Sequence, residues 1–207
     1  MTKCIEIGLG PLVSYFEYAA IYFGIIVGLA LANILTSLHK LIEAGPRVRW
    51  GWMAPASAGY AATLTINEFW YLWLGQRHEP LRTILTWYPL AVAFALLFLM
   101  CAAALPDDAA DGDIDLGHYY FDNRKRFWGF STALHAFNLV SWTVALAIAG
   151  FALQFLQGNA VPILVNAGEG LLSLTLVFTR AKWWHALVLV GLWLFTLCFF
   201  GPMPLGR

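Results

Sequence analysis

The residues best suited to chemistry are polar side chains that interrupt long apolar runs. Three of them, Glu17, Glu68 and Glu169, are glutamates. A charge at bilayer depth costs about 2.5 to 3.5 kcal/mol even on a lenient insertion scale, so such a residue usually faces a protein interior or a wet cavity. A histidine and three amides occur in similar surroundings. The candidates for an ion path are Glu17, Glu68, Glu169, His135, Asn138, Asn166 and Asn67.

Two kinds of chemistry fit these side chains. Carboxylates and an imidazole in a dry helix bundle can relay protons or hold a cation. The same groups can also form a hydrogen-bond network that only holds helices together. We therefore keep two hypotheses: a small cation or proton transporter or channel, and a non-catalytic structural or accessory membrane protein that binds a partner or self-associates. Ala20, Gly24, Gly28 and Ala32 form a small-residue stripe that would allow close helix approach, including a homo-oligomer.

An acidic stretch offers a second candidate site. Asp111, Asp113, Asp115 and Asp122 match positions 1, 3, 5 and 12 of a calcium-binding loop. Leu116, however, stands where that loop needs a glycine, and Asp122 replaces the bidentate glutamate. A turn of solvated aspartates accounts for this stretch better, so we assign no metal site.

The elements that must position these residues follow from the composition. The 207-residue chain is 60% hydrophobic and 12% charged, whereas soluble domains carry about 25% charged residues. A helix needs roughly 20 apolar residues to cross a bilayer. We predict a single all-α transmembrane domain, residues 1–207, whose six transmembrane helices cover residues 12–38, 52–74, 84–105, 127–156, 160–179 and 183–200, with a cytosolic loop at 106–126. Pro55, Pro89 and Pro162 then fall within opening turns, where proline is tolerated.

The basic residues predict how this bundle is oriented. Those of the first, third and fifth connections are Lys40, Arg47, Arg49, Arg124, Lys125, Arg126, Arg180 and Lys182. Those of the opposite side are half as many: Lys3, Arg77, Arg82 and Arg207. Because positive residues accumulate on the cytoplasmic side, we expect a multi-pass protein of the bacterial inner membrane, surrounded by lipid, with both termini in the periplasm.

The two halves of the sequence also show a weak similarity. Placing Ala61 on Ala160 aligns Asn67 with Asn166, and paired aromatic residues open the next helix in each half: Trp87, Tyr88, Trp183 and Trp184. Because each half would hold an odd number of helices, the pattern is compatible with a 3+3 repeat of inverted topology, as in many secondary transporters.

Other functions find no support in the sequence. The net charge is zero, so no basic field would attract nucleic acid. The motifs GxSxG and HExxH and a phosphate-binding glycine loop are absent, so we expect neither enzymatic activity nor a cofactor. Cys4, Cys101 and Cys198 have no metal-binding spacing.

Several short motifs also resemble a known group of proteins. They are Glu17-Tyr18, Asn33-Ile34-Leu35, Phe69-Trp70, Pro106-Asp107-Asp108, Asp115-Leu116 and Tyr119-Tyr120-Phe121, followed by basic residues and Phe127. Together they resemble a group of small polytopic bacterial inner-membrane proteins of unknown function. The resemblance implies a bacterial membrane location and no particular chemistry.

Overall fold

The structure is a computed structural model that describes residues 15–75, 84–107, 113–149 and 152–200. In these residues the chain is almost entirely helical, which confirms the expected all-α class. The α-helices are α1 (Tyr15–Ala44), α2 (Met53–Gly75), α3 (Ile84–Ala102), α4 (Leu116–Ala149), α5 (Ala152–Phe178) and α6 (Lys182–Phe200). A 3-10 helix (Gly45–Arg47) and the two-residue strands β1 (Val48–Arg49) and β2 (Ile114–Asp115) complete the described elements.

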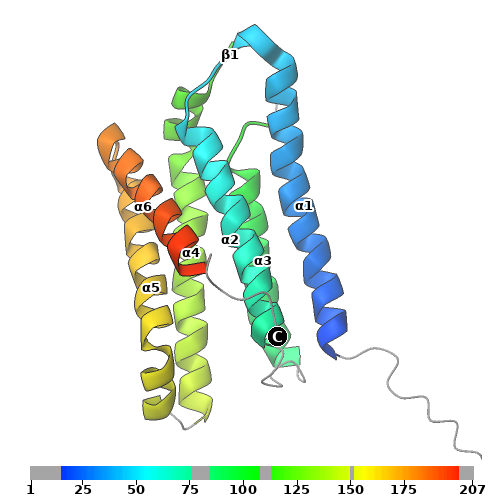
Figure 1. Cartoon of the computed structure of the whole chain (residues 1–207), viewed down its shortest axis with the longest axis vertical. Coiled ribbons are helices and arrows are strands. Elements are labelled where there is room, and N and C mark those ends of the chain that lie inside the picture. The colour runs from blue at the N-terminus through cyan, green and yellow to red at the C-terminus, as the bar shows by residue number, and fades with distance from the viewer. Residues whose placement is uncertain (1–14, 76–83, 108–112, 150–151, 201–207) are drawn as a thin grey trace, which may run out of the picture.

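The helices form an elongated bundle whose long axis they follow (Figure 1). α1 packs against α2 and α3 at one edge, and α4 and α5 lie side by side at the other. α2 also contacts α4 and α6, so it joins the two groups. A polar side chain on the inner faces of α2, α4 or α5 is therefore surrounded by protein.

One end of the bundle is tied together by the connections. β1 pairs in parallel with β2, with Val48 opposite Ile114 and Arg49 opposite Asp115. The hydroxyl of Ser37 donates a 2.9 Å hydrogen bond to Asp107 Oδ1, and Lys40 Nζ donates another of 2.9 Å to the Asp107 carbonyl. These contacts join the end of α1 to the segment that follows α3, and the segment that precedes α2 to the segment that precedes α4.

α4 begins at Leu116, so the predicted loop at 106–126 is too long at its carboxyl end. Asp115 caps the helix, because its Oδ1 accepts a 2.9 Å hydrogen bond from the backbone N–H of His118. Leu116 and Tyr120 are buried on the inner face of this first part of α4. The segment is thus an amphipathic helix, and its charged outer face made it look like a loop in the sequence.

This helix start also removes the calcium loop. Asp122 lies within α4 and forms a 2.9 Å ion pair with His118, one helical turn away. Residues 116–122 are helical, so they cannot wrap around a cation as a calcium loop does. Asp113 is exposed, and Asp111 lies outside the described residues.

The boundary between the fourth and fifth helices was also placed wrongly. α4 ends at Ala149 and α5 begins at Ala152, whereas the predicted spans were 127–156 and 160–179. Pro162 consequently lies inside α5, not in its opening turns. Gly150 follows α4 in the sequence, as is common after a helix end. The other predicted helices agree with α1, α2, α3 and α6 except at their ends, and residues 12–14 are outside the described part.

The described helices differ in how well they meet a simple criterion for membrane spans. Among the described residues, one helix, Glu17–Arg47, is long and apolar enough to cross a membrane, so the six predicted spans stay a prediction. Two further apolar stretches in the described residues, Trp87–Ala102 and Ile163–Phe178, are shorter than that criterion requires.

Candidate functional site

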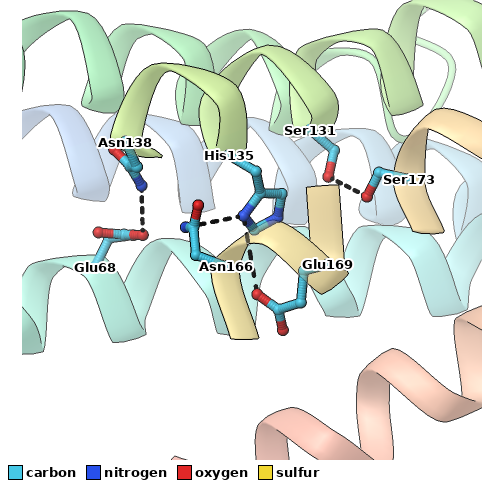
Figure 2. A network of polar contacts seen from close by, with 7 residues as sticks. All are labelled: Glu68, Ser131, His135, Asn138, Asn166, Glu169 and Ser173. Atoms are coloured by element: carbon cyan, nitrogen blue, oxygen red, sulfur yellow. Dashed lines mark hydrogen bonds and ion pairs between the residues drawn. The ribbon is translucent and has the colours of Figure 1, made fainter. Parts of the chain in front are cut away.

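A cluster of polar side chains lies between α2, α4 and α5, in the interior of the bundle. On α4, Ser131, His135 and Asn138 follow one another at steps of four and three residues, which places them on one helix face. Asn166, Glu169 and Ser173 share one face of α5 at steps of three and four residues, and α2 contributes Tyr60 and Glu68. We call these eight residues the central polar cluster; Figure 2 shows all of them except Tyr60.

His135 is the centre of the cluster. Its Nδ1 lies 3.2 Å from Asn166 Nδ2 and 3.9 Å from Glu169 Oε2 (Figure 2). The side chain of His135 is 2% exposed and that of Glu169 is 9% exposed. Because an amide nitrogen donates and a carboxylate accepts, Nδ1 faces both a donor and an acceptor. When Nδ1 carries no proton, it accepts a hydrogen bond from the Asn166 amide. When Nδ1 is protonated, its N–H faces the Glu169 carboxylate.

Two further contacts connect the same helices. Asn138 Nδ2 donates a 3.3 Å hydrogen bond to Glu68 Oε1, and this contact joins α4 to α2. The hydroxyls of Ser131 and Ser173 are 3.0 Å apart and join α4 to α5 one turn away from His135. The cluster therefore connects three helices with direct polar contacts.

Gly170 lets α4 and α5 come close at this level. A Cβ added to Gly170 would lie 2.9 Å from the Cβ of His135, closer than real Cβ contacts allow. The glycine next to Glu169 is thus needed for the short distance between the two backbones. Because Gly170 has no Cβ, His135 can pack directly against the backbone of α5.

Several polar atoms of this region are buried and have no hydrogen-bond partner. They are Tyr60 Oη, Asn67 Nδ2, His135 Nε2, Asn166 Oδ1 and Glu169 Oε1. An unsatisfied buried polar group costs about 1 to 3 kcal/mol, so native proteins seldom retain such groups without a reason. The unsatisfied set holds nitrogen as well as oxygen atoms, which suits water and protons. In the described part of the chain, no three His, Cys, Asp or Glu residues gather as metal ligands would.

A second polar chain lies nearer the start of α4. Trp128 Nε1 donates a 3.0 Å hydrogen bond to Tyr120 Oη, which lies 2.8 Å from His185 Nδ1. His185 Nε2 is 2.9 Å from the Thr179 carbonyl. An indole N–H only donates and a carbonyl only accepts, so the Tyr120 hydroxyl donates to His185, whose own proton is on Nε2. Burial raises the pKa of Tyr120. The Tyr120 hydroxyl therefore keeps the proton that it donates to His185.

The structure brings most of the predicted residues together. Glu68, Glu169, His135, Asn138 and Asn166 are all in the central polar cluster. Asn67 precedes Glu68 on α2 and is partly buried. Glu17 lies apart from these residues: it is exposed near the start of α1, a helix that packs on α2 and α3.

Sequence reasoning missed the hydroxyl groups of Ser131 and Tyr60. Ser131 precedes His135 by one helical turn, so the helical period could have revealed it. Tyr60 gave no such signal, because its place depends on how α2 packs against α4. The partnership of Tyr120 with His185 was hidden by the assignment of Tyr120 to a loop.

Comparisons of this chain with protein-family models, with curated proteins and with solved structures find no match.

Proposed function

We propose that the protein is a six-span protein of the bacterial inner membrane that moves protons through the central polar cluster. The observation that carries this proposal is the approach of His135 to Glu169, 3.9 Å apart at 2% and 9% exposure. An imidazole and a carboxylate can exchange a proton after a small movement of either side chain. Burial excludes bulk water, so the proton has to use these groups.

The outward-facing side chains support a membrane environment. Large apolar residues are exposed on the outer faces of several helices: Ile21, Ile25 and Leu29 on α1, Leu164, Leu171 and Phe178 on α5, and Leu187 and Leu194 on α6. Soluble monomers rarely expose contiguous apolar patches of more than a few hundred Å². With polar groups inside and apolar groups outside, the bundle is suited to lipid.

Helix lengths are compatible with six spans. The shortest helices, α3 and α6, have 19 residues each, which at 1.5 Å per residue gives about 28 Å, close to the roughly 30 Å of a hydrocarbon core. The lengths also fall in the same order in each half, with 30, 23 and 19 residues in α1 to α3 and 34, 27 and 19 in α4 to α6. This order supports an inverted 3+3 repeat as part of the proposal.

The basic residues support an orientation. Lys40, Arg49, Arg124 and Lys182 all lie at or near the end of the bundle where β1 pairs with β2. By the excess of positive charge this end faces the cytoplasm, and both termini then face the periplasm.

The chemistry of the cluster favours protons over a metal cation. Hard cations bind cages of oxygen acceptors. Here the buried atoms without a partner include two nitrogens, His135 Nε2 in the cluster and Asn67 Nδ2 next to Glu68 in the sequence, as well as the oxygens Asn166 Oδ1 and Glu169 Oε1. Water molecules can satisfy both kinds of atom and can carry protons between them.

Proton flux into liposomes tests the proposal. The purified protein is reconstituted, a pH gradient is imposed, and internal pH is followed with a trapped dye. We expect Glu169→Gln and His135→Asn to abolish the flux. Matched controls are Glu43→Gln and His39→Asn, which change an exposed pair at the end of α1 whose side chains are 66% and 70% exposed. Absent flux in the wild type, or full flux in Glu169→Gln, would refute the proposal.

A second candidate function is a structural protein that self-associates. Gly28 on α1 is exposed and would meet no atom within 4 Å if it carried a Cβ, and Ala32, one turn later, is exposed too. Such small residues allow a second helix to approach closely. This function predicts that Gly28→Ile lowers the dimer fraction seen by cross-linking in liposomes while Glu169→Gln does not. A monomeric wild-type protein would eliminate it.

A further inference from the structure

A pocket of about 380 Å³ lies at the end of the bundle where α3 finishes and α4 begins. Its size is within the range of small-molecule sites. It shares no residue with the central polar cluster. The pocket is lined by Leu99, Ala102, Ala103, Pro106, Asp107, Tyr119, Asn123, Arg126 and Phe130.

The lining changes in character along the bundle axis. α3 runs toward this end and α4 runs away from it, so Leu99 and Phe130 lie at the deep side and Asp107 at the outer side. With a rise of 1.5 Å per residue, Arg126 lies roughly 6 Å nearer the outer side than Phe130. The order from inside to outside is therefore apolar, then positive, then negative.

Within the described residues, Asp107 already accepts two hydrogen bonds, from Ser37 at Oδ1 and from Lys40 at its backbone carbonyl. Asp107 Oδ2 and the Arg126 guanidinium have no hydrogen-bond partner among these residues and can contact a ligand. Tyr119 Oη donates to the Ala103 carbonyl at 3.4 Å, and Asn123 Nδ2 donates to the same carbonyl and to Tyr119 Oη. Burial raises the pKa of Tyr119, the charge of Asp107 raises it further, and Arg126 lowers it. Both charges thus act on one hydroxyl inside the pocket. Arg126 and Asp107 are themselves exposed.

We propose that this pocket binds a phospholipid whose headgroup carries a phosphate and a primary ammonium, as in phosphatidylethanolamine. The acyl chain lies along Leu99 and Phe130, the phosphate binds Arg126, and the ammonium binds Asp107. A phospholipid presents its acyl chain, phosphate and ammonium in this same order from the bilayer interior outward. Arginine offers paired N–H donors that suit a phosphate. The proposal rests on the membrane location proposed above, and it does not depend on proton transfer.

The charge pattern discriminates between lipid classes. An anionic headgroup such as phosphatidylglycerol would satisfy Arg126 and leave the Asp107 carboxylate facing a second negative group. A choline headgroup carries a positive charge but no N–H to donate to Asp107. The ammonium form therefore fits both charges best.

Native mass spectrometry of the full chain tests the proposal. The protein is released from nanodiscs that contain equal amounts of phosphatidylethanolamine, phosphatidylglycerol and phosphatidylcholine, and retained lipid is counted. We expect phosphatidylethanolamine to be retained preferentially. Arg126→Gln and Asp107→Asn should each lower its retention about tenfold, as expected for loss of one charge-assisted contact. Asparagine keeps one oxygen to accept the Ser37 hydrogen bond and replaces the other by an NH2 donor, so the second variant removes the charge and the second acceptor without breaking that contact.

The control is Lys125→Gln, which removes an exposed positive charge next to Arg126 but outside the pocket. Equal retention of phosphatidylglycerol, or an equal loss in Lys125→Gln, would overturn the proposal. Displacement of the lipid by soluble phosphoethanolamine at the same concentration would show that the pocket takes a free metabolite instead. Membrane location is checked separately by carbonate extraction, so its failure is distinguishable from a failure of the pocket.

Discussion

Replacing Gly170 by alanine tests whether the close approach of α4 and α5 holds the central polar cluster in place. The new Cβ would stand 2.9 Å from His135 Cβ, whereas ordinary contact begins at 3.4 Å. The obstacle is the first atom of the His135 side chain, which cannot rotate away. The two helices must therefore separate by about 0.5 Å.

The structure provides a control on the same helix. A Cβ at Gly168, two residues earlier, would meet no atom within 4 Å. In both variants alanine favours the helix over glycine by about 0.5 to 1 kcal/mol. Overpacking in a core costs about 1 to 3 kcal/mol, and this cost applies to Gly170→Ala alone. The difference in unfolding free energy between the two variants should therefore be about 1 to 3 kcal/mol, since the helix term cancels.

Reversible unfolding in mixed detergent micelles, followed by circular dichroism, measures this difference. Gly168→Ala should be as stable as the wild type or more stable, and Gly170→Ala should be the less stable of the pair. In liposomes Gly170→Ala should also reduce proton flux, because the separation moves His135 away from Glu169. Equal stability of the two variants would refute the claimed contact between α4 and α5.

Three further predictions concern other parts of the structure. Tyr120→Phe should lower the unfolding free energy by about 1 to 3 kcal/mol, because it leaves buried groups without a partner, and Tyr22→Phe on a half-exposed ring should change the melting temperature little. The pKa of Asp115 is lowered, first of all by the hydrogen bond from the backbone N–H of His118. The Asp115 carboxylate therefore stabilises α4 fully above its unfolded pKa of about 3.9, and this stabilisation is lost as the pH falls through the lower folded pKa. Hydrogen exchange at residues 116–119 should speed up over this pH range in the wild type and not in Asp115→Asn. The coupling between Ser131 and Ser173 in a double-mutant cycle to alanine should be about 0.6 kcal/mol, a typical value for interhelical hydrogen bonds in membranes, and zero coupling would contradict the contact.

The helical architecture and much of the site could be predicted from the sequence. Apolar runs of about 20 residues predict helices because a helix satisfies every backbone polar group within a bilayer, and a glutamate inside such a run is expected to be covered by protein. Glu68 and Glu169 met this expectation because α2 and α5 turn those faces inward. His135 and Asn138 followed, since a spacing of three residues places them on one side of α4.

The remaining features depend on tertiary packing. Glu17 is as polar as Glu68, but α1 stands at the edge of the bundle and leaves this residue exposed. The start of α4 was hidden because its outer face is charged, and only the burial of Leu116 and Tyr120 against neighbouring segments distinguishes it from a loop. The position of Tyr60 depends on the packing of α2 against α4, which the sequence of α2 alone does not specify.

The pairing of β1 with β2 limits how the molecule can change shape. It fastens the α1–α2 hairpin to the segment that precedes α4, and the bond from Tyr120 to His185 fastens α4 to the beginning of α6 at the same end. Any large motion of the helices would then hinge at this end and spread the opposite ends. α3 and α4 are neighbours, so a cross-link between them near the hinge should leave this motion intact, whereas a cross-link between their far ends should stop it.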